Sequence, residues 1–407
     1  MRQRLSQLTL SSALCAALAV TAVTARADFD AGLEAFKRGD VATAVAEWQA
    51  AADRGDAESA YHLGVVYAEG RGVPQDPQRA FELLSRASDG GSRDATFALA
   101  QLYSAGIGVE RDADRALELL NKAADAGQVV ALFHLGMLHA EGRGVPQDPK
   151  RAFELVSRAA DQGSLGATVA QAEMFMNGFG VERDQQKGLE LLRKAADEKH
   201  PDALYELANL YRRGDVVGPQ DYAKAAELYR AAVEGGHVGA ANNLGAMYLF
   251  GQGFEQNPAE ARKFFTFAAE HGLPRGMTNL GYLFEEGLGT EQDLLQAARL
   301  YRVAAELRDV EARQRLAALR SDLDAAYAAP STQKELIRQI QLFLTTLGLE
   351  PGPADGVAGP RTVGAIREFQ EKLGLPAAGE PTMQLREQLL EVLAPPLPQA
   401  QAPAQPP

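Results

Sequence analysis

A leucine recurs along this chain at an almost constant interval of 36 residues, and this interval limits what the chain can fold into. The leucines are Leu63, Leu99, Leu135, Leu207, Leu244, Leu280 and Leu316, and Gln171 occupies the one vacant position. A small residue follows each of them, and an aromatic residue stands four positions after most of them. A period of this length indicates stacked supersecondary units rather than one globular core.

Each period contains two amphipathic helical patterns separated by a glycine-rich loop. In the second period, Ala95, Leu99 and Tyr103 share one face of the first helix. The loop sequence Gly-Arg-Gly-Val-Pro-Gln-Asp occurs identically at 70–76 and 142–148. Its aspartate stands where the second helix begins. An N-cap carboxylate there is worth about 1 kcal/mol, because it accepts a hydrogen bond from an otherwise unpaired amide.

One such unit cannot fold alone. Ordering its backbone costs about 1–2 kcal/mol per residue, whereas each buried Leu-sized side chain returns only about 1.5–3 kcal/mol. Neighbouring units must therefore stack. The sequence predicts an all-α repeat solenoid over 28–321, with seven full repeats at about 57–308. A partial unit at 28–56 precedes them, and a capping helix at 309–321 follows.

The repeats resemble the Sel-one-like repeat family, longer relatives of the tetratricopeptide repeats. The resemblance rests on Leu-Gly, two residues, Tyr, then Gly-x-Gly-Val and Asp before an alanine-rich second helix, and it covers about 28–321. The fourth repeat departs from the pattern at Gln171, and the fifth breaks its loop at 214–218. The resemblance implies a right-handed α-α superhelix that binds partner proteins without catalysis, often in bacterial envelopes.

The first-helix positions outside the leucine stripe vary between repeats, and a partner protein is expected to bind there. Varied polar groups with a few exposed aromatic side chains suit a protein-binding wall. The alternative is a face that is merely solvated. The candidate residues lie in the fifth to seventh repeats and are Glu206, Asn209, Arg213, Asn243, Phe250, Asn279, Tyr282 and Glu286.

The period ends after Ala317, and a smaller domain is predicted at 331–394 beyond a linker at 322–330. Thr332 and Glu335 form a capping box for its first helix. Two more helical patterns follow a loop rich in Gly and Pro. About 60 residues in three helices are just enough to enclose a core.

This domain resembles the peptidoglycan-binding domain type 1 family. Asp-Gly-x-x-Gly-Pro-x-Thr at 355–362 and Ala-Ile-x-x-Phe-Gln at 365–370 carry the resemblance, although the family's usual Gly-x-x-Gly lead-in is missing. The resemblance implies a non-catalytic three-helix module that binds peptidoglycan. The candidate contact residues are Asp355, Arg361, Thr362 and Gln370. The alternative for each is an ordinary structural role in a turn, at a helix start or against loop backbone.

The first 27 residues read as a secretory signal peptide. Arg2 and Arg4 precede an apolar stretch, and Ala-Arg-Ala at 25–27 supplies the small residues that signal peptidase requires. Cys15, the only cysteine, lies inside this stretch, so the mature chain is expected to contain no thiol. The sequence predicts an exported, periplasmic protein, and secretion is the alternative. The uncharged segment at 395–407 holds six prolines and is expected to be a disordered tail.

Composition and motif content argue against nucleic-acid binding and catalysis. The net charge of −13 is unsuited to a phosphate backbone, and the six histidines have no metal-ligand spacing. We therefore expect no enzyme, no cofactor, no metal, no nucleic-acid partner and no membrane span in the mature chain. The expected partners are peptidoglycan and an unidentified envelope protein. The alternatives are a cell-wall hydrolase or β-lactam-processing enzyme with an unrecognised site, and a secreted protein that acts on host or neighbouring cells.

Overall fold

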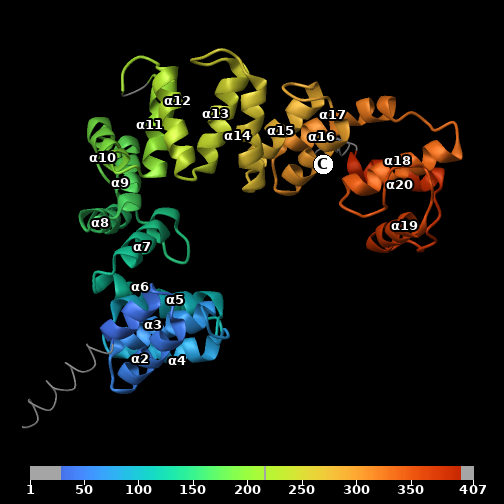
Figure 1. The fold of residues 1–407 in the computed structure, drawn as a ribbon. Helices are drawn as coiled ribbons and strands as arrows, with labels where there is room; N and C mark the ends of the chain where they lie inside the picture. The colour runs from blue at the N-terminus through green and yellow to red at the C-terminus, as the bar shows by residue number, and fades with distance from the viewer. Residues whose placement is uncertain (1–28, 215–216, 396–407) are drawn as a thin grey trace, which may run out of the picture. The chain divides into compact units, whose positions relative to one another are not determined.

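The computed structural model describes residues 29–214 and 217–395, and every regular element in these ranges is a helix (Figure 1). The predicted fold class, an all-α repeat solenoid followed by a small three-helix domain, is confirmed. The predicted signal peptide and all but one residue of the predicted tail lie outside the described residues. None of the described helices is both long and apolar enough to cross a membrane.

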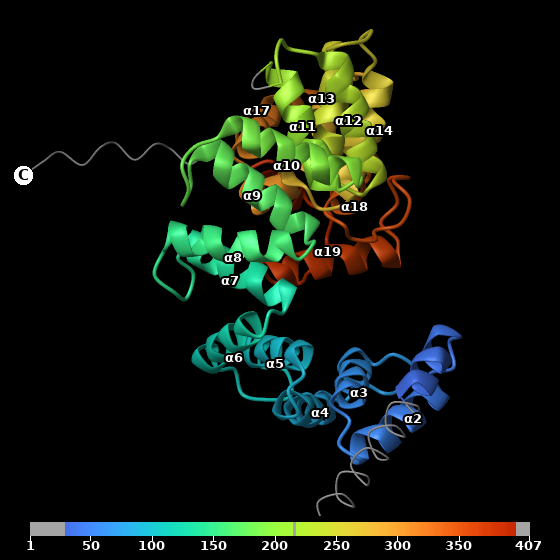
Figure 2. The same ribbon diagram turned by 90° about the vertical axis from the view of Figure 1, so that its left-hand side faces the viewer.

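The chain forms two compact units, Met1–Leu192 and Arg193–Pro407. In the first unit, a helical segment at 29–37 precedes the repeat helices, and the two helices of one repeat lie side by side (Figure 2). The helices are α2 (Val41–Asp53), α3 (Ala57–Glu69), α4 (Pro77–Asp89), α5 (Arg93–Ala105), α6 (Ala113–Asp125), α7 (Val129–Glu141), α8 (Pro149–Asp161), α9 (Leu165–Asn177) and α10 (Gln185–Asp197), of which the last crosses the unit boundary.

The second unit holds three more repeats, a longer closing helix and the C-terminal module. The helices are α11 (Pro201–Arg213), α12 (Tyr222–Glu234), α13 (Val238–Phe250), α14 (Pro258–Glu270), α15 (Pro274–Glu286), α16 (Leu294–Glu306), α17 (Val310–Ala326), α18 (Gln333–Thr346), α19 (Pro360–Lys372) and α20 (Met383–Leu393).

The loop residues bound the repeat helices as the sequence predicts. The first helix of the first full repeat, α3, is followed by Gly70, whose φ of +67° is a left-handed conformation that glycine adopts at little cost. The second helix begins at Asp76, whose carboxylate accepts a hydrogen bond from the Arg79 amide at 2.9 Å. The same arrangement recurs along the array, so each helix from α2 to α16 has 13 residues.

The small residue after each leucine brings the two helices of a repeat close together. A β carbon on Gly64 would lie 2.8 Å from Cγ of Leu84, and one on Gly281 would lie 2.7 Å from Cε1 of Tyr301. Both distances are shorter than van der Waals contact allows. The second helix therefore packs its large side chain directly on the backbone of the first helix.

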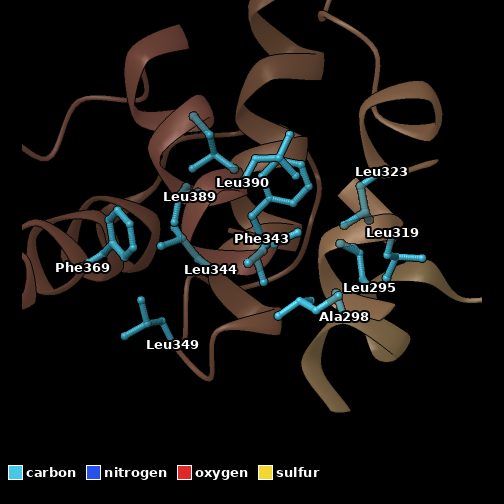
Figure 3. Close-up of a cluster of buried hydrophobic side chains, with 14 of the residues drawn as sticks. Leu295, Ala298, Leu319, Leu323, Phe343, Leu344, Leu349, Phe369, Leu389 and Leu390 are labelled. Carbon is cyan, nitrogen blue, oxygen red and sulfur yellow. The ribbon is translucent and has the colours of Figure 1, made fainter. Parts of the chain in front are cut away.

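The C-terminal module shares a hydrophobic core with the last repeat (Figure 3). The sequence places a linker at 322–330, but α17 continues through Ala326. Leu323, which lies in that expected linker, is fully buried. Leu323 belongs to the same buried cluster as Phe343 of α18 and Leu390 of α20, so the core continues past the predicted end of the helix. Only a short segment, 327–332, separates α17 from α18.

Candidate functional site

Amide side chains on successive first helices form hydrogen bonds between the fifth, sixth and seventh repeats. Nδ2 of Asn243 on α13 donates to Oδ1 of Asn209 on α11 at 3.3 Å. Nδ2 of Asn279 on α15 donates to Oδ1 of Asn242 on α13 at 2.8 Å. The two pairs link three successive repeats through side chains that can both donate and accept. We call Asn209, Asn242, Asn243 and Asn279 the amide row.

A buried tyrosine supports one end of the amide row. The hydroxyl of Tyr229 on α12 donates to Oδ1 of Asn209 at 2.5 Å, and it accepts from Nε of Arg212 at 3.2 Å and Nδ2 of Asn243 at 3.3 Å. Its ring is fully buried, and this burial raises the pKa of Tyr229. The hydroxyl therefore keeps its proton at neutral pH and holds the Asn209 side chain in one orientation.

A second buried tyrosine organises a charged group in the seventh repeat. The hydroxyl of Tyr301 on α16 donates to Oε2 of Glu285 on α15, and Nη1 of Arg315 donates to the same oxygen at 3.2 Å. The Arg315 guanidinium also lies 4.5 Å from the centroid of the Tyr282 ring. Burial, together with the adjacent Glu285 carboxylate, raises the pKa of Tyr301 strongly. The neutral hydroxyl thus holds the Glu285 carboxylate, and this carboxylate pairs with the Arg315 guanidinium.

The predicted partner-binding residues differ widely in exposure. Arg213, Phe250 and Glu286 are exposed, and Phe250 exposes 67 % of its surface. Glu206, Asn243, Asn279 and Tyr282 are half-buried. Asn209 is only 8 % exposed, and its side chain is already engaged by Tyr229 and Asn243, so it supports this surface rather than presenting a free amide.

The sequence pattern did not single out six residues that organise this surface. They are Arg212, Tyr229, Asn242, Glu285, Tyr301 and Arg315. Tyr229 and Tyr301 stand two repeat periods apart with Phe265 between them, and this recurrence of a large ring on the second helix was the available signal. From the sequence alone, this recurrence indicates only core packing, because the side chain of the first helix that faces each ring is not known.

In the C-terminal module, the side chain of Gln341 holds the loop between α18 and α19. Gln341 is 1 % exposed. Its Nε2 lies 3.1 Å from Oδ1 of Asp355, 3.0 Å from the Val357 carbonyl oxygen and 3.1 Å from Oγ1 of Thr362. Its Oε1 accepts from the Gly356 amide at 2.9 Å. The sequence reading missed Gln341, although a glutamine within an apolar helix pattern was a signal for a buried polar contact.

The four predicted peptidoglycan contacts divide into two structural and two surface positions. Thr362 is buried and donates to the Pro351 carbonyl oxygen at 2.8 Å, and Oε1 of Gln370 accepts from the Gly379 amide at 3.0 Å. Both therefore brace loops. Asp355 is exposed, and hydrogen bonds from the Val357 amide and from Gln341 lower its pKa, so the carboxylate stays ionised. Arg361 is exposed and lies 3.6 Å from Glu350.

These surfaces have the chemistry of binding sites. They present amides, single charges and an exposed ring, which can pair with a ligand's polar groups and cover its apolar ones. Within the part of the chain that the structure describes, no three His, Asp or Glu side chains gather as they would around a metal ion.

Two family models match the chain. The Sel1 repeat matches seven consecutive segments, 57–92, 93–128, 129–164, 166–200, 201–237, 238–273 and 274–309. A peptidoglycan binding domain matches 333–389. No curated protein matches the chain.

The fold is also similar to solved structures. A Sel1 repeat protein from Oxalobacter formigenes is 29 % identical, with a TM-score of 0.56 over 72 % of this chain and 86 % of that one. The protective antigen c5321, present in uropathogenic Escherichia coli strains and displaying an SLR fold, is 23 % identical, with a TM-score of 0.50 over 91 % and 84 % of the two chains.

Proposed function

Because the chain belongs to the Sel1 repeat family and carries a peptidoglycan-binding domain, we propose that it is a non-catalytic adaptor of the cell envelope. Its repeats hold a protein partner, and its C-terminal module holds peptidoglycan. The observation that carries this proposal is that two binding modules share one chain and, in the second unit, one hydrophobic core. A partner on the adjoining repeats is thereby fixed to the wall without a flexible tether.

The assignment as an adaptor rests on the class of both matched families, which are binding modules rather than enzymes. A periplasmic location is supported by the signal peptide expected at 1–27 and by the place where peptidoglycan lies. Release of muropeptides, or turnover of a chromogenic β-lactam, by the purified protein would contradict the non-catalytic part of the proposal.

The partner surface that we propose comprises the amide row and the exposed residues around it. The inter-repeat hydrogen bonds hold the first helices of three repeats in register, so the surface is preorganised and loses little entropy on binding. Phe250 exposes an apolar ring at the end of α13, with Arg213 and Glu286 at the matching positions of the repeats before and after it. An exposed ring among varied polar groups suits a protein partner.

Co-sedimentation with purified sacculi tests the peptidoglycan half of the proposal. Deleting the module would expose the core that it shares with α17, so point variants are the better test. We expect the full chain to pellet with sacculi and Arg361→Glu to pellet less. Lys372→Glu is the matched control, because it reverses a charge at the other end of α19. Failure of the full chain to pellet, or equal pelleting of both variants, would show that this half is wrong.

Proximity labelling in the periplasm tests the partner half. The full chain fused to a labelling enzyme is compared with the Phe250→Asp variant, which places a charge in the proposed surface. Val310→Asp is the control, because Val310 is also an exposed apolar residue but stands at the start of α17. We expect a set of labelled proteins that Phe250→Asp removes and Val310→Asp preserves. Identical sets for all three proteins would rule out this surface.

A further inference from the structure

The loop between α7 and α8 departs from the way in which several other repeat loops pack. In several repeats, the second glycine of this loop lies against the first residue of the second helix of the previous repeat. A β carbon on that glycine would overlap the backbone of this residue. These pairs are Gly108 with Pro77, Gly180 with Pro149 and Gly289 with Pro258. A β carbon on Gly144 would meet no atom within 4 Å. The residue to which Gly144 corresponds in this pairing is Ala113, which is exposed.

One side chain of the second repeat is also smaller than its counterparts in the first and third repeats. In the first and third repeats, Phe81 and Phe153 pack edge-on against an aromatic ring of the next first helix, Tyr103 and Phe175, at centroid distances of 5.6 and 5.2 Å. The second repeat has Leu117 at the corresponding position. A leucine fills less space than a phenylalanine. Leu117 therefore leaves open a space between the second and third repeats that Phe81 and Phe153 fill at the equivalent positions.

An open pocket of about 620 Å³ occupies this place between α5, α6 and α7. Its walls are mainly apolar and include Leu117, Leu120, Phe133, Met137 and Leu138. Pockets of roughly 300–1,000 Å³ with apolar walls and a few polar groups are typical of sites that enclose a ligand. The volume is ample for one large apolar side chain.

Three residues that line this pocket lie at the same repeat positions as the proposed partner surface. Met137 and Gln101 stand at the position of Asn209 and Tyr282, and Glu141 stands at that of Phe250. The pocket therefore lies on the face of the first helices that varies between repeats. This placement favours a protein segment as its occupant.

The charges beside the pocket define the chemistry of that segment. Glu141 forms an ion pair with Arg143, so their charges cancel. Asp114 is exposed at the start of α6 and has no ion-pair partner among the described residues. The pocket thus has one uncompensated carboxylate beside its apolar walls, and a cationic side chain of the ligand would complement it.

We propose that this pocket receives one large apolar side chain of a partner-protein segment, next to a Lys or Arg that pairs with Asp114. The inference rests on the proposed adaptor function and specifies a second contact for a protein partner. The uncharged segment 395–407 of this chain offers no cation for Asp114, which is why we assign the pocket to another protein.

Peptide selection on the full-length mature chain tests this proposal. A random twelve-residue library is selected on the protein, and synthetic copies of the selected peptides are measured by fluorescence anisotropy. We expect the selected peptides to share a large apolar residue adjacent to Lys or Arg. Leu117→Phe, which restores the residue of the flanking repeats, should weaken their binding by about tenfold or more, because the anchor loses its buried position.

Further variants separate the two contacts and guard against misfolding. Ala113→Pro restores the residue against which other loops pack, and proline is well tolerated at the first position of a helix. We expect it to weaken peptide binding as Leu117→Phe does. Asp114→Asn should weaken binding by several-fold and reduce its dependence on salt. Asp125→Asn, at the other end of α6, should change neither quantity.

Four outcomes would overturn the proposal. They are no selected peptide, equal binding to wild type and Leu117→Phe, binding of a synthetic 395–407 peptide that Leu117→Phe abolishes, and self-association that Leu117→Phe abolishes. Peptides that bind the Leu117→Phe variant but not the Phe250→Asp variant would show that this pocket is not used while the proposed partner surface is. The failure of this inference is thereby distinguishable from failure of the proposed function.

Discussion

At the scale of single residues, the polarity of a buried ring matches the residue that faces it from the first helix. Tyr229 bonds to Arg212, and Tyr301 bonds to Glu285. Phe265, at the same position of the repeat between them, lies in one apolar cluster with Leu249, which stands at the position of Arg212 and Glu285. A hydroxyl is therefore present where a polar partner can receive it and absent where none is available.

This match predicts that a hydroxyl is stabilising at position 301 and destabilising at the equivalent position 265. Tyr301→Phe should lower the free energy of unfolding by about 1 kcal/mol, because Glu285 keeps its bond to Arg315 when the hydroxyl is lost. Phe265→Tyr should cost more, about 1–3 kcal/mol, because it buries a hydroxyl beside Leu249 without a partner. Urea unfolding of the two variants measures both values. A stabilising effect of Phe265→Tyr would contradict the match.

The raised pKa of Tyr301 predicts a loss of stability in alkaline solution. Its phenol ionises less readily in the folded chain than in the unfolded chain, where the pKa is near 10.0. The folded state therefore holds the proton more tightly, and the resulting stability is complete below pH 10.0 and falls as the pH rises above it. Thermal unfolding between pH 9 and 11 should show a steeper decline for wild type than for Tyr301→Phe. Parallel curves would assign the decline to other groups.

At the scale of elements, the sequence predicts the repeat helices well because their boundaries depend on local chemistry. Gly70 ends one helix and Asp76 caps the next, and each acts within a few residues of its own helix. These helix boundaries can therefore be predicted from the local sequence. The end of α17 has a distant cause. Leu323 lies in one buried cluster with residues of α16, α18 and α20, and the last two helices come later in the chain. The sequence pattern of α17 alone therefore cannot predict where this helix ends.

The candidate sites show the same difference between features that depend on local sequence and features that depend on distant residues. Their general placement, on the variable face of the first helices and on the loop before α19, rests on recurrence and on the family resemblance and stays a prediction. The role of each side chain could not be predicted, because Asn209 and Thr362 are engaged by Tyr229 and Gln341, which lie elsewhere in the sequence. Burial and hydrogen-bond partners across 20 or so residues decide whether a polar group faces a ligand or supports its neighbours.

The loop before α19 depends on one side chain of α18, which gives a prediction at this scale. Gln341→Leu has a similar shape but removes the partner of the Gly356 amide, whereas Oγ1 of Thr362 keeps its bond to the Pro351 carbonyl oxygen. We expect a loss of about 1–3 kcal/mol, because the Gly356 amide is left unpaired. Hydrogen exchange of the Gly356 amide should accelerate, while amides in the middle of α20 should change only with global stability. An unchanged Gly356 amide would show that backbone packing alone holds the loop.

At the scale of the whole molecule, the sequence predicts two modules in series, and within the second unit the structure joins them. A repeat array is stabilised by contacts between nearest neighbours, and its terminal repeats normally need a cap. Here the repeats end with α17, and the core of the module is continuous with that of α16 and α17. The module therefore has two roles: we propose that it binds the wall, and it stabilises the last repeat through the shared core.

This double role predicts that damage on one side of the shared core spreads to the other. Leu323→Ala removes a fully buried side chain from α17 and should cost about 2–5 kcal/mol. Because Leu323 belongs to the same cluster as Phe343 and Leu390, hydrogen exchange should accelerate in α18 and α20 as well as in α17. Leu135→Ala is the control, since it makes an equally buried cavity in α7 and should leave exchange in the module unchanged. Acceleration confined to α17 in the Leu323→Ala variant would mean that the module folds independently, and that the repeats are tethered to the wall rather than fixed to it.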